Sequence, residues 1–128
     1  MRKVATALLV GALSVPGLAS AGQAKHHAKD PNTSHGIASV YARSLVGHRT
    51  ANGERLDMDH MTAASLKLPL GTVVTVTNRR NGRKATVRVN DRGPYTKRFL
   101  IDLSPAAAAA LGLGRTGTIP VEIKVASR

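Results

Sequence analysis

Two short alternating segments joined by an Asn-Gly pair constrain the fold of this chain more than any other feature. Residues 72–77 (TVVTVT) and 84–89 (KATVRV) are rich in β-branched side chains, which favour strands. Between them, Asn81-Gly82 is a strong hairpin signal, because both residue types accept the positive φ angles that tight hairpin turns require. The sequence therefore predicts an antiparallel β-hairpin near the middle of the domain.

The remaining pattern is also mainly β. Residues 37–41 form a further strand candidate, and residues 119–125 (IPVEIKV) alternate apolar and polar side chains, which predicts a last strand with one buried face. One helix is expected: Ser104 suits its N-cap, Pro105 its first position, and Gly112 its end. Several short strands and one helix within about ninety residues are typical of a small β-barrel.

The first residues of the chain are expected to be a targeting segment and a linker. Two basic residues precede a mostly apolar run, 5–18, and small residues up to Ala21 offer a cleavage site, which predicts a secretory signal peptide over 1–21. Residues 22–35 (GQAKHHAKDPNTSH) are polar and show no hydrophobic period, so we expect a flexible leader. The barrel domain should then cover 36–126, exported to the periplasm or the outside of the cell and soluble there.

Composition limits the possible partners of this domain. The chain has no cysteine, so it forms no disulfide and carries no lipid anchor on a cysteine, and its core alone must hold it together. The 19 Lys and Arg against 7 acidic residues give a net charge of +12, which attracts anionic partners. Nucleic acid is not expected outside the cell, whereas anionic cell-wall polymers are. His26, His27 and His35 are more simply explained as a solvated segment than as a metal site.

The few acidic residues are the candidates for chemistry. Asp91 ends an alternating strand just before Gly93-Pro94 break the pattern, so its carboxylate either satisfies amides of a turn or faces a cleft. Glu54 and Asp57 lie in a second loop, and two such loops could form an acid/base pair. Asp102, just before the helix, is expected to favour the helix dipole.

Five segments in this order resemble the rare lipoprotein A (RlpA) family. They are R-T-A-N-G-E, T-A-A-S-L-K-L-P-L-G-T, V-T-N, V-N-D-R-G-P and I-D-L-S, and the resemblance runs from Gly36 to about Val125. It implies a mainly β fold, a six-stranded double-psi β-barrel with one or two short helices. It also implies an exported lytic transglycosylase that cleaves peptidoglycan glycan strands endolytically.

The resemblance further implies the site and its chemistry. A lytic transglycosylase breaks the bond between N-acetylmuramic acid and N-acetylglucosamine without water, because the muramyl 6-hydroxyl closes onto the anomeric carbon of the same sugar, and it needs no cofactor. The match carries Asp91 onto the acid/base and Glu54 and Asp57 onto further catalytic carboxylates. The residues expected to bind substrate are Tyr41, Thr50, Asn52, Ser65, Asn90, Arg92 and Tyr95.

Two positions depart from the family pattern. Ser65 stands where many relatives carry His, and Val40 stands where relatives often carry Trp. These departures keep a second hypothesis open, a non-catalytic, expansin-like module that binds the cell wall. As partners we expect peptidoglycan glycan strands, with the cell-division machinery as a further candidate, and we expect a monomer.

Overall fold

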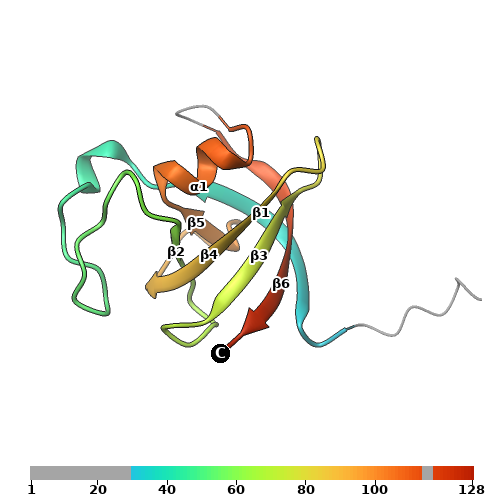
Figure 1. Ribbon diagram of the computed structural model, residues 1–128, viewed down its shortest axis with the longest axis horizontal. Coiled ribbons are helices and arrows are strands. Elements are labelled where there is room, and N and C mark those ends of the chain that lie inside the picture. Colours follow the sequence, from blue (N-terminus) through green and yellow to red (C-terminus); the bar gives the residue numbers. More distant parts are fainter. Residues whose placement is uncertain (1–29, 114–116) are drawn as a thin grey trace, which may run out of the picture.

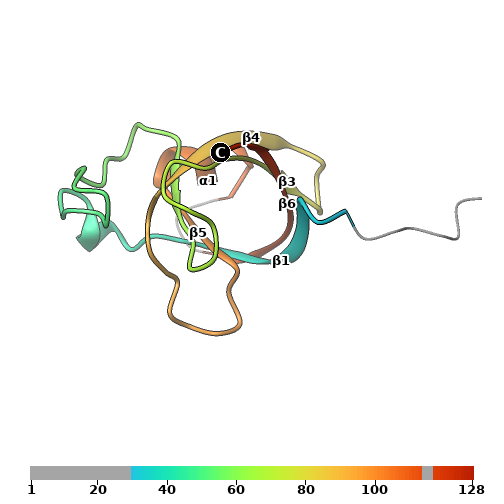
Figure 2. The same cartoon turned by 90° about the horizontal axis from the view of Figure 1, so that it is seen from below.

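The chain folds into a closed barrel of six strands, described by a computed structural model for residues 30–113 and 117–128. Around the barrel the strands follow the order β1-β5-β2-β4-β3-β6 (Figures 1 and 2). This confirms the expected mainly β, six-stranded barrel. The bounds of the elements are β1 Thr33–Val40, η2 (a 3-10 helix) Arg43–Leu45, β2 Thr62–Ala64, β3 Val73–Asn78, β4 Lys84–Asp91, β5 Ile101–Leu103, α1 Pro105–Ala110 and β6 Ile119–Ser127.

Strands β3 and β4 form the hairpin predicted around Asn81-Gly82. Gly82 has a φ of 77°, an angle that residues with a side chain rarely adopt. Its amide donates a hydrogen bond to the Asn78 carbonyl at 2.8 Å. The β-branched alternation places Val74 and Val87 in the barrel interior, where they are 0% and 1% exposed. The hairpin is therefore fixed both by its turn and by the side chains that it buries.

The first strand begins at Thr33, inside the segment 22–35 that was expected to be a leader. This part of β1 pairs antiparallel with β6, and His35 Nε2 lies 3.3 Å from the Glu122 carboxylate. The prediction of a leader is thus wrong for its last three residues. These residues show no hydrophobic alternation, and they form a strand because they pair with β6. Strand β6 runs to Ser127, two residues past the strand expected at 119–125 and one residue past the expected end of the domain at 126. The expected signal peptide lies outside the described residues.

Two parallel strand pairs bring distant segments together. Strand β1 pairs with β5 and β2 pairs with β4 in parallel, while β2 and β5 pair antiparallel. Strands β2 and β5 have three residues each, which is too short for a sequence period to reveal them. They nevertheless join the two sides of the barrel, and their outer faces carry the candidate site described below.

Helix α1 begins behind the cap that the sequence predicted. The Ser104 hydroxyl oxygen accepts a hydrogen bond from the Ala107 amide at 3.2 Å. The same oxygen accepts from the Thr62 amide at 3.2 Å and donates to the His60 carbonyl at 2.8 Å, so the cap also ties α1 to β2. Gly112, with a φ of 82°, follows the helix as expected. Helix α1 packs against β2, β4 and β5 (Figure 1).

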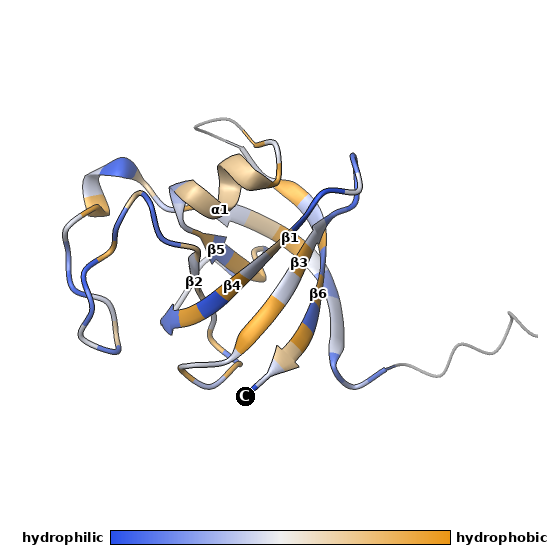
Figure 3. Cartoon of the chain, in the orientation of Figure 1, coloured by the Kyte–Doolittle hydropathy of each residue, from blue (hydrophilic) through white to orange (hydrophobic). Residues whose placement is uncertain are grey.

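Aliphatic side chains fill the barrel, and apolar positions recur along β3, β4 and β6 (Figure 3). A second, smaller cluster joins Tyr41, Leu56 and Ala64 on the outside of the barrel. It attaches the loop segment 41–61 to the face that carries β2. Within the described residues, no helix has the length and apolar character needed to cross a membrane.

Candidate active site

A β-bulge near the end of β4 turns Asp91 outward. In the parallel pair with β2, Val89 lies beside Ala63 and Asp91 lies beside Ala64, so Asn90 is an extra residue on β4. Strict alternation would place Asp91 on the same face as buried Val89. The extra residue reverses this orientation, since a bulge re-aims the side chains next to it. Asp91 is consequently half-buried at a cavity on the outer face of the barrel.

Three donors hold the Asp91 carboxylate in place. Its Oδ1 accepts from the amides of Ala51 and Arg92, each at 2.8 Å, and its Oδ2 accepts from the Tyr41 hydroxyl at 2.7 Å. Two of these donors belong to the main chain, and the third is a buried side chain. Asp91 therefore satisfies turn amides and also lines the cavity, so both readings of its sequence position apply.

A second carboxyl group, Asp102, lies in the same row of residues. Cross-strand pairing sets Ser39 of β1 beside Asp102 of β5, Asp102 beside Ala64 of β2, and Ala64 beside Asp91 of β4. The Ser39 hydroxyl donates a hydrogen bond to the Asp102 carboxylate. Ala64 contributes only a methyl group between the two acids and packs with Tyr41 and Leu56. The row therefore holds two acids on either side of a small residue.

The cavity in front of this row has a volume of about 390 Å³ and is lined by both acids, Tyr41 and Tyr95. That volume lies within the usual range of small-molecule sites. Tyr41 is buried against Leu56, whereas Tyr95 is 77% exposed. An exposed aromatic ring beside carboxyl groups can stack on the apolar face of a sugar ring.

Burial raises the pKa of the Asp102 carboxyl above its ordinary value; the hydrogen bond from Ser39 opposes this rise and the charge of Asp91 adds to it. A raised pKa increases the protonated fraction near neutral pH, as a proton donor requires. Burial, followed by the hydrogen bond to Asp91, also raises the pKa of the Tyr41 phenol. Tyr41 therefore stays a hydrogen-bond donor to Asp91 across the physiological range.

Glu54 does not line this cavity. Its carboxylate makes two hydrogen bonds with the Arg88 guanidinium, at 2.7 and 2.9 Å. The bond from Arg88, followed by the bond from Asn52, lowers the pKa of Glu54 to about 2, so it is ionised and cannot donate a proton at neutral pH. The pair fastens the loop to β4, and the Ala51 amide of that loop reaches Asp91. Glu54 is thus placed to position Asp91 rather than to react.

Asp57 also lies away from the cavity. Its Oδ1 accepts from the Asp59 amide at 2.5 Å, and its Oδ2 lies 3.1 Å from His60 Nδ1. The Asp59 amide is the largest of the causes that lower the pKa of Asp57. These contacts close a short surface turn. The three carboxylates expected to act together are therefore not brought together in this structure.

Three of the residues expected to bind substrate support the loop of Glu54. The Thr50 hydroxyl donates to Asn52 Oδ1 at 2.7 Å, and the Asn52 side chain donates to the Glu54 carboxylate. Asn90 is 2% exposed, and within the described residues its Oδ1 has no hydrogen-bond partner. The structure thus places Thr50 and Asn90 beneath the surface and leaves Asn52 exposed beside Glu54.

The other four expected substrate-binding residues lie at or near the cavity. Tyr41, Arg92 and Tyr95 line it, and Ser65 lines a neighbouring groove that also includes Tyr95. Arg92 Nη1 donates to the Ser65 carbonyl at 2.9 Å, so Arg92 supports the chain at Ser65. These positions agree with a site built around Asp91.

Sequence reasoning missed Ser39 and Asp102. We expected Asp102 to act on the helix dipole, but its carboxylate instead bonds to Ser39, and the first turn of α1 has no acidic residue. A signal was available, because Asp102 alternates with the buried residues Ile101 and Leu103 and must point outward. That pattern spans three residues only, and nothing in it shows which residue lies across from Asp102.

Similarity to curated proteins agrees with this geometry. A protein of Nostoc sp. named probable endolytic peptidoglycan transglycosylase RlpA is 53% identical over 95 residues, covering 73% of this chain and 26% of that protein. The endolytic peptidoglycan transglycosylases RlpA of Vibrio cholerae and Campylobacter jejuni are 50% and 45% identical over 93 residues. Those matches cover 73% of this chain and 35% and 34% of the relatives, so the chain spans about a third or less of their lengths.

Solved structures show the same barrel. An expansin of Clavibacter michiganensis in its apo form matches with a TM-score of 0.59 and 26% identity, covering 73% of this chain and 50% of the expansin. A mutant of that expansin in complex with cellohexaose matches with a TM-score of 0.56. The Streptomyces papain inhibitor matches with a TM-score of 0.57 and 26% identity, covering 74% of this chain and 94% of the inhibitor. These likenesses confirm the double-psi β-barrel.

The sequence profile of one family, described as lytic transglycolase, matches residues 33–123, which include strands β1 to β5, the first five residues of β6 and both acids of the cavity. Together with the RlpA relatives, this match shows that the chain belongs to the lytic transglycolase family.

Proposed function

We propose that this domain is an exported endolytic lytic transglycosylase that cleaves the bond between N-acetylmuramic acid and N-acetylglucosamine in peptidoglycan glycan strands. The observation that carries this proposal is the pair of acids, Asp91 and Asp102, on either side of Ala64 in one cavity. The names of the relatives from Vibrio cholerae and Campylobacter jejuni support the same activity. The product strands would end in anhydromuramyl groups.

The reaction needs one proton donated and one proton removed. Asp102, whose pKa is raised by burial, gives its proton to the glycosidic oxygen that leaves with N-acetylglucosamine. The primary hydroxyl of the muramyl ring then attacks its own anomeric carbon, and Asp91 takes the proton of that hydroxyl. One bond breaks, one forms, and no water is consumed. Proton exchange between the acids and solvent restores the starting state.

The shape of the surface supports cleavage within a strand rather than at its end. On one side the cavity shares Pro94, Tyr95 and Phe99 with a groove of about 570 Å³. On the other side it shares Val40 and Tyr41 with a hollow of about 500 Å³. The acids therefore lie between two further hollows, which a polymer can occupy on both sides of the cleaved bond.

The decisive experiment analyses purified glycan strands by mass spectrometry after incubation with the mature protein. We expect anhydromuramyl ends with the wild type, and about 100- to 10,000-fold slower cleavage with Asp91→Asn and with Asp102→Asn. Glu122→Gln removes an acid outside the cavity and should cleave at the wild-type rate, and thermal melting should confirm that all variants fold.

Each other outcome has a definite meaning. An unchanged glycan profile with the folded wild type contradicts the proposal and favours a non-catalytic, expansin-like binding module. Reducing ends in place of anhydromuramyl ends show hydrolysis. Full cleavage by Asp102→Asn, together with loss of cleavage by Asp91→Asn, assigns both proton transfers to Asp91, the role that the family resemblance implies.

A further inference from the structure

The turn between β3 and β4 concentrates positive charge that the cleavage reaction does not use. Residues 79–84 read RRNGRK, so four of these six residues are cations and none is acidic or apolar. Figure 3 shows the turn as strongly hydrophilic. We call its four exposed basic side chains the hairpin cations: Arg79, Arg80, Arg83 and Lys84.

The turn lies at the opposite end of β4 from the acids. Figure 1 shows it projecting beyond the barrel, away from the arrowhead that ends β4. Lys84 begins this strand and Asp91 ends it, so about 23 Å of extended chain separates them. None of the hairpin cations is among the described residues that line the cavity, the groove or the hollow. A partner that contacts only the turn therefore leaves the cavity open.

Uncharged groups hold the turn in shape. The Gly82 amide donates to the Asn78 carbonyl, and the Asn78 amide donates to the Arg83 carbonyl, each at 2.8 Å. The side-chain amides of Asn78 and Asn81 both donate to the Leu111 carbonyl, at 2.8 and 3.0 Å, which braces the turn against the end of α1. The shape of the turn therefore does not depend on its charged side chains.

The hairpin cations have no role in the fold that would explain them. Arg80 and Arg83 bond through their main-chain amides, and in the described part of the chain none of the four side chains forms an ion pair or a hydrogen bond. The Leu111 carbonyl already accepts two bonds, which use both of its lone pairs, so it needs no cation. Like charges this close repel one another, and an anionic partner removes that repulsion.

The form of the turn indicates which kind of anion it fits. A single sugar or phosphate ester is bound in a concave site, where several groups converge on it. This turn projects instead, so several of its cations reach anions together when those anions lie in a plane. The turn has no aromatic ring to stack on nucleic-acid bases and no apolar side chain to enter hydrocarbon, so its contact is with charged headgroups alone.

We propose that the turn at residues 79–84 binds the phosphate headgroups of an anionic lipid surface. A guanidinium donates two parallel hydrogen bonds to a phosphate, which suits the three arginines of the turn. Each cation close to such a surface strengthens binding by about fivefold. The proposal goes beyond the proposed function and does not rest on it, because it involves no glycan and no residue of the cavity.

Co-sedimentation of the mature protein with lipid vesicles tests this assignment. Vesicles of equal parts phosphatidylglycerol and phosphatidylcholine are compared with vesicles of phosphatidylcholine alone. We expect binding to the anionic vesicles only, and weaker binding as salt rises above physiological strength. The double change Arg80→Gln/Lys84→Gln should weaken this binding about ten- to thirtyfold. Its melting temperature should match the wild type, since the hydrogen bonds of the turn do not use these side chains.

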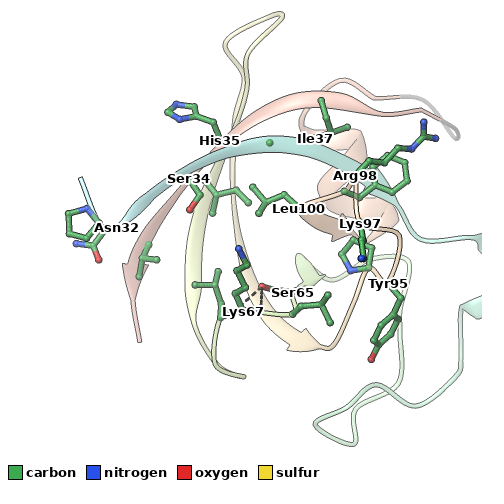
Figure 4. A pocket seen from close by; sticks show the side chains of 18 of the residues that line it. Asn32, Ser34, His35, Ile37, Ser65, Lys67, Tyr95, Lys97, Arg98 and Leu100 are labelled. Atoms are coloured by element: carbon green, nitrogen blue, oxygen red, sulfur yellow. Dashed lines mark hydrogen bonds between the residues drawn. The ribbon is translucent and has the colours of Figure 1, made fainter. Parts of the chain in front are cut away.

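The matched control is Lys97→Gln/Arg98→Gln, which also removes one lysine and one arginine. Both residues are exposed, but they line the groove beside the acids (Figure 4). This control should weaken vesicle binding by about threefold at most. An equal loss in both double variants overturns the proposal, because it makes net charge the cause. Equal binding to the neutral vesicles also overturns it. Tighter binding of soluble polyphosphate than of anionic vesicles, at equal phosphate concentration, points to a linear polyanion and overturns the lipid surface as the partner.

Discussion

Arg88 determines what Glu54 can do. Three acids of the same domain have three different surroundings: Glu54 is paired with a guanidinium, Asp91 accepts bonds from two amides and a phenol, and Asp102 is half-buried. Their side chains are chemically similar, but only Asp91 and Asp102 share a cavity. The role of a carboxyl group therefore depends on the residue that it contacts as well as on its type. For Glu54 that residue is Arg88, 34 positions away in the sequence.

Changing Glu54 to Gln should reveal the ion pair through its pH dependence. The folded-state pKa of Glu54, about 2, lies below its ordinary value of 4.5, so the pair stabilises the fold above about pH 4.5 and is lost as pH falls through about 2. The difference in melting temperature between wild type and Glu54→Gln should therefore be steady at neutral pH and shrink in that acid range. A difference that grows on acidification would contradict the pairing.

The same variant separates positioning from catalysis. Glu54→Gln loosens the loop whose Ala51 amide binds Asp91, but it leaves both cavity acids in place. We expect its rate of anhydromuramyl formation to fall less than that of Asp91→Asn. An equal or larger loss in folded protein would make Glu54 a direct participant in the reaction.

At the level of elements, the bulge in β4 and the cap of α1 decide where the site lies. The bulge at Asn90 turns Asp91 to the outer face, and the Ser104 cap ties the helix to β2, the strand between the two acids. The bulge sets the direction of the Asp91 side chain, and the cap holds helix α1 against β2, which lies between β4 and β5.

Replacing Ser104 by Ala should lower the free energy of unfolding by about 2 kcal/mol, because it removes the helix cap and the two hydrogen bonds that the Ser104 hydroxyl makes with the Thr62 amide and the His60 carbonyl. Chemical denaturation measures this change. Ser44→Ala, at an exposed position of η2, is the matched control and should change stability by less than about 0.5 kcal/mol. Equal effects of the two changes would mean that the Ser104 network contributes little.

Local patterns predicted the elements that are long enough to show a period. The hairpin, the last strand and the capped helix follow from alternation, Asn81-Gly82 and Ser104. Strands β2 and β5 have three residues each, and the bulge at Asn90 depends on a partner strand, so no local pattern reveals them. The family resemblance assigned a role to Asp91 but none to Asp102; alternation with Ile101 and Leu103 points Asp102 outward, and only strand pairing shows that it lies in the same row as Asp91.

At the level of the whole molecule, the distribution of charge matters more than its total. The chain carries +12 overall, yet two of its seven acids lie in one cavity between hollows, and cations line the groove on one side. In the proposed function, the basic exterior would attract an anionic polymer from a distance, whereas the cavity would act on a neutral glycosidic bond of that polymer. Attraction and reaction would then be performed by different parts of the surface.

The antiparallel neighbours β1 and β6 give the barrel one more property. They place its first and last strands side by side, and the Val125 amide donates to the Asn32 carbonyl at 2.9 Å. A circular permutant that joins these ends with a short Gly/Ser linker and opens between Asn81 and Gly82 should keep every strand pair and fold, as circular dichroism and melting would measure. Failure to fold would mean that the hairpin turn itself is needed to form the barrel. The order of the strands around the barrel therefore does not depend on which loop holds the two chain ends.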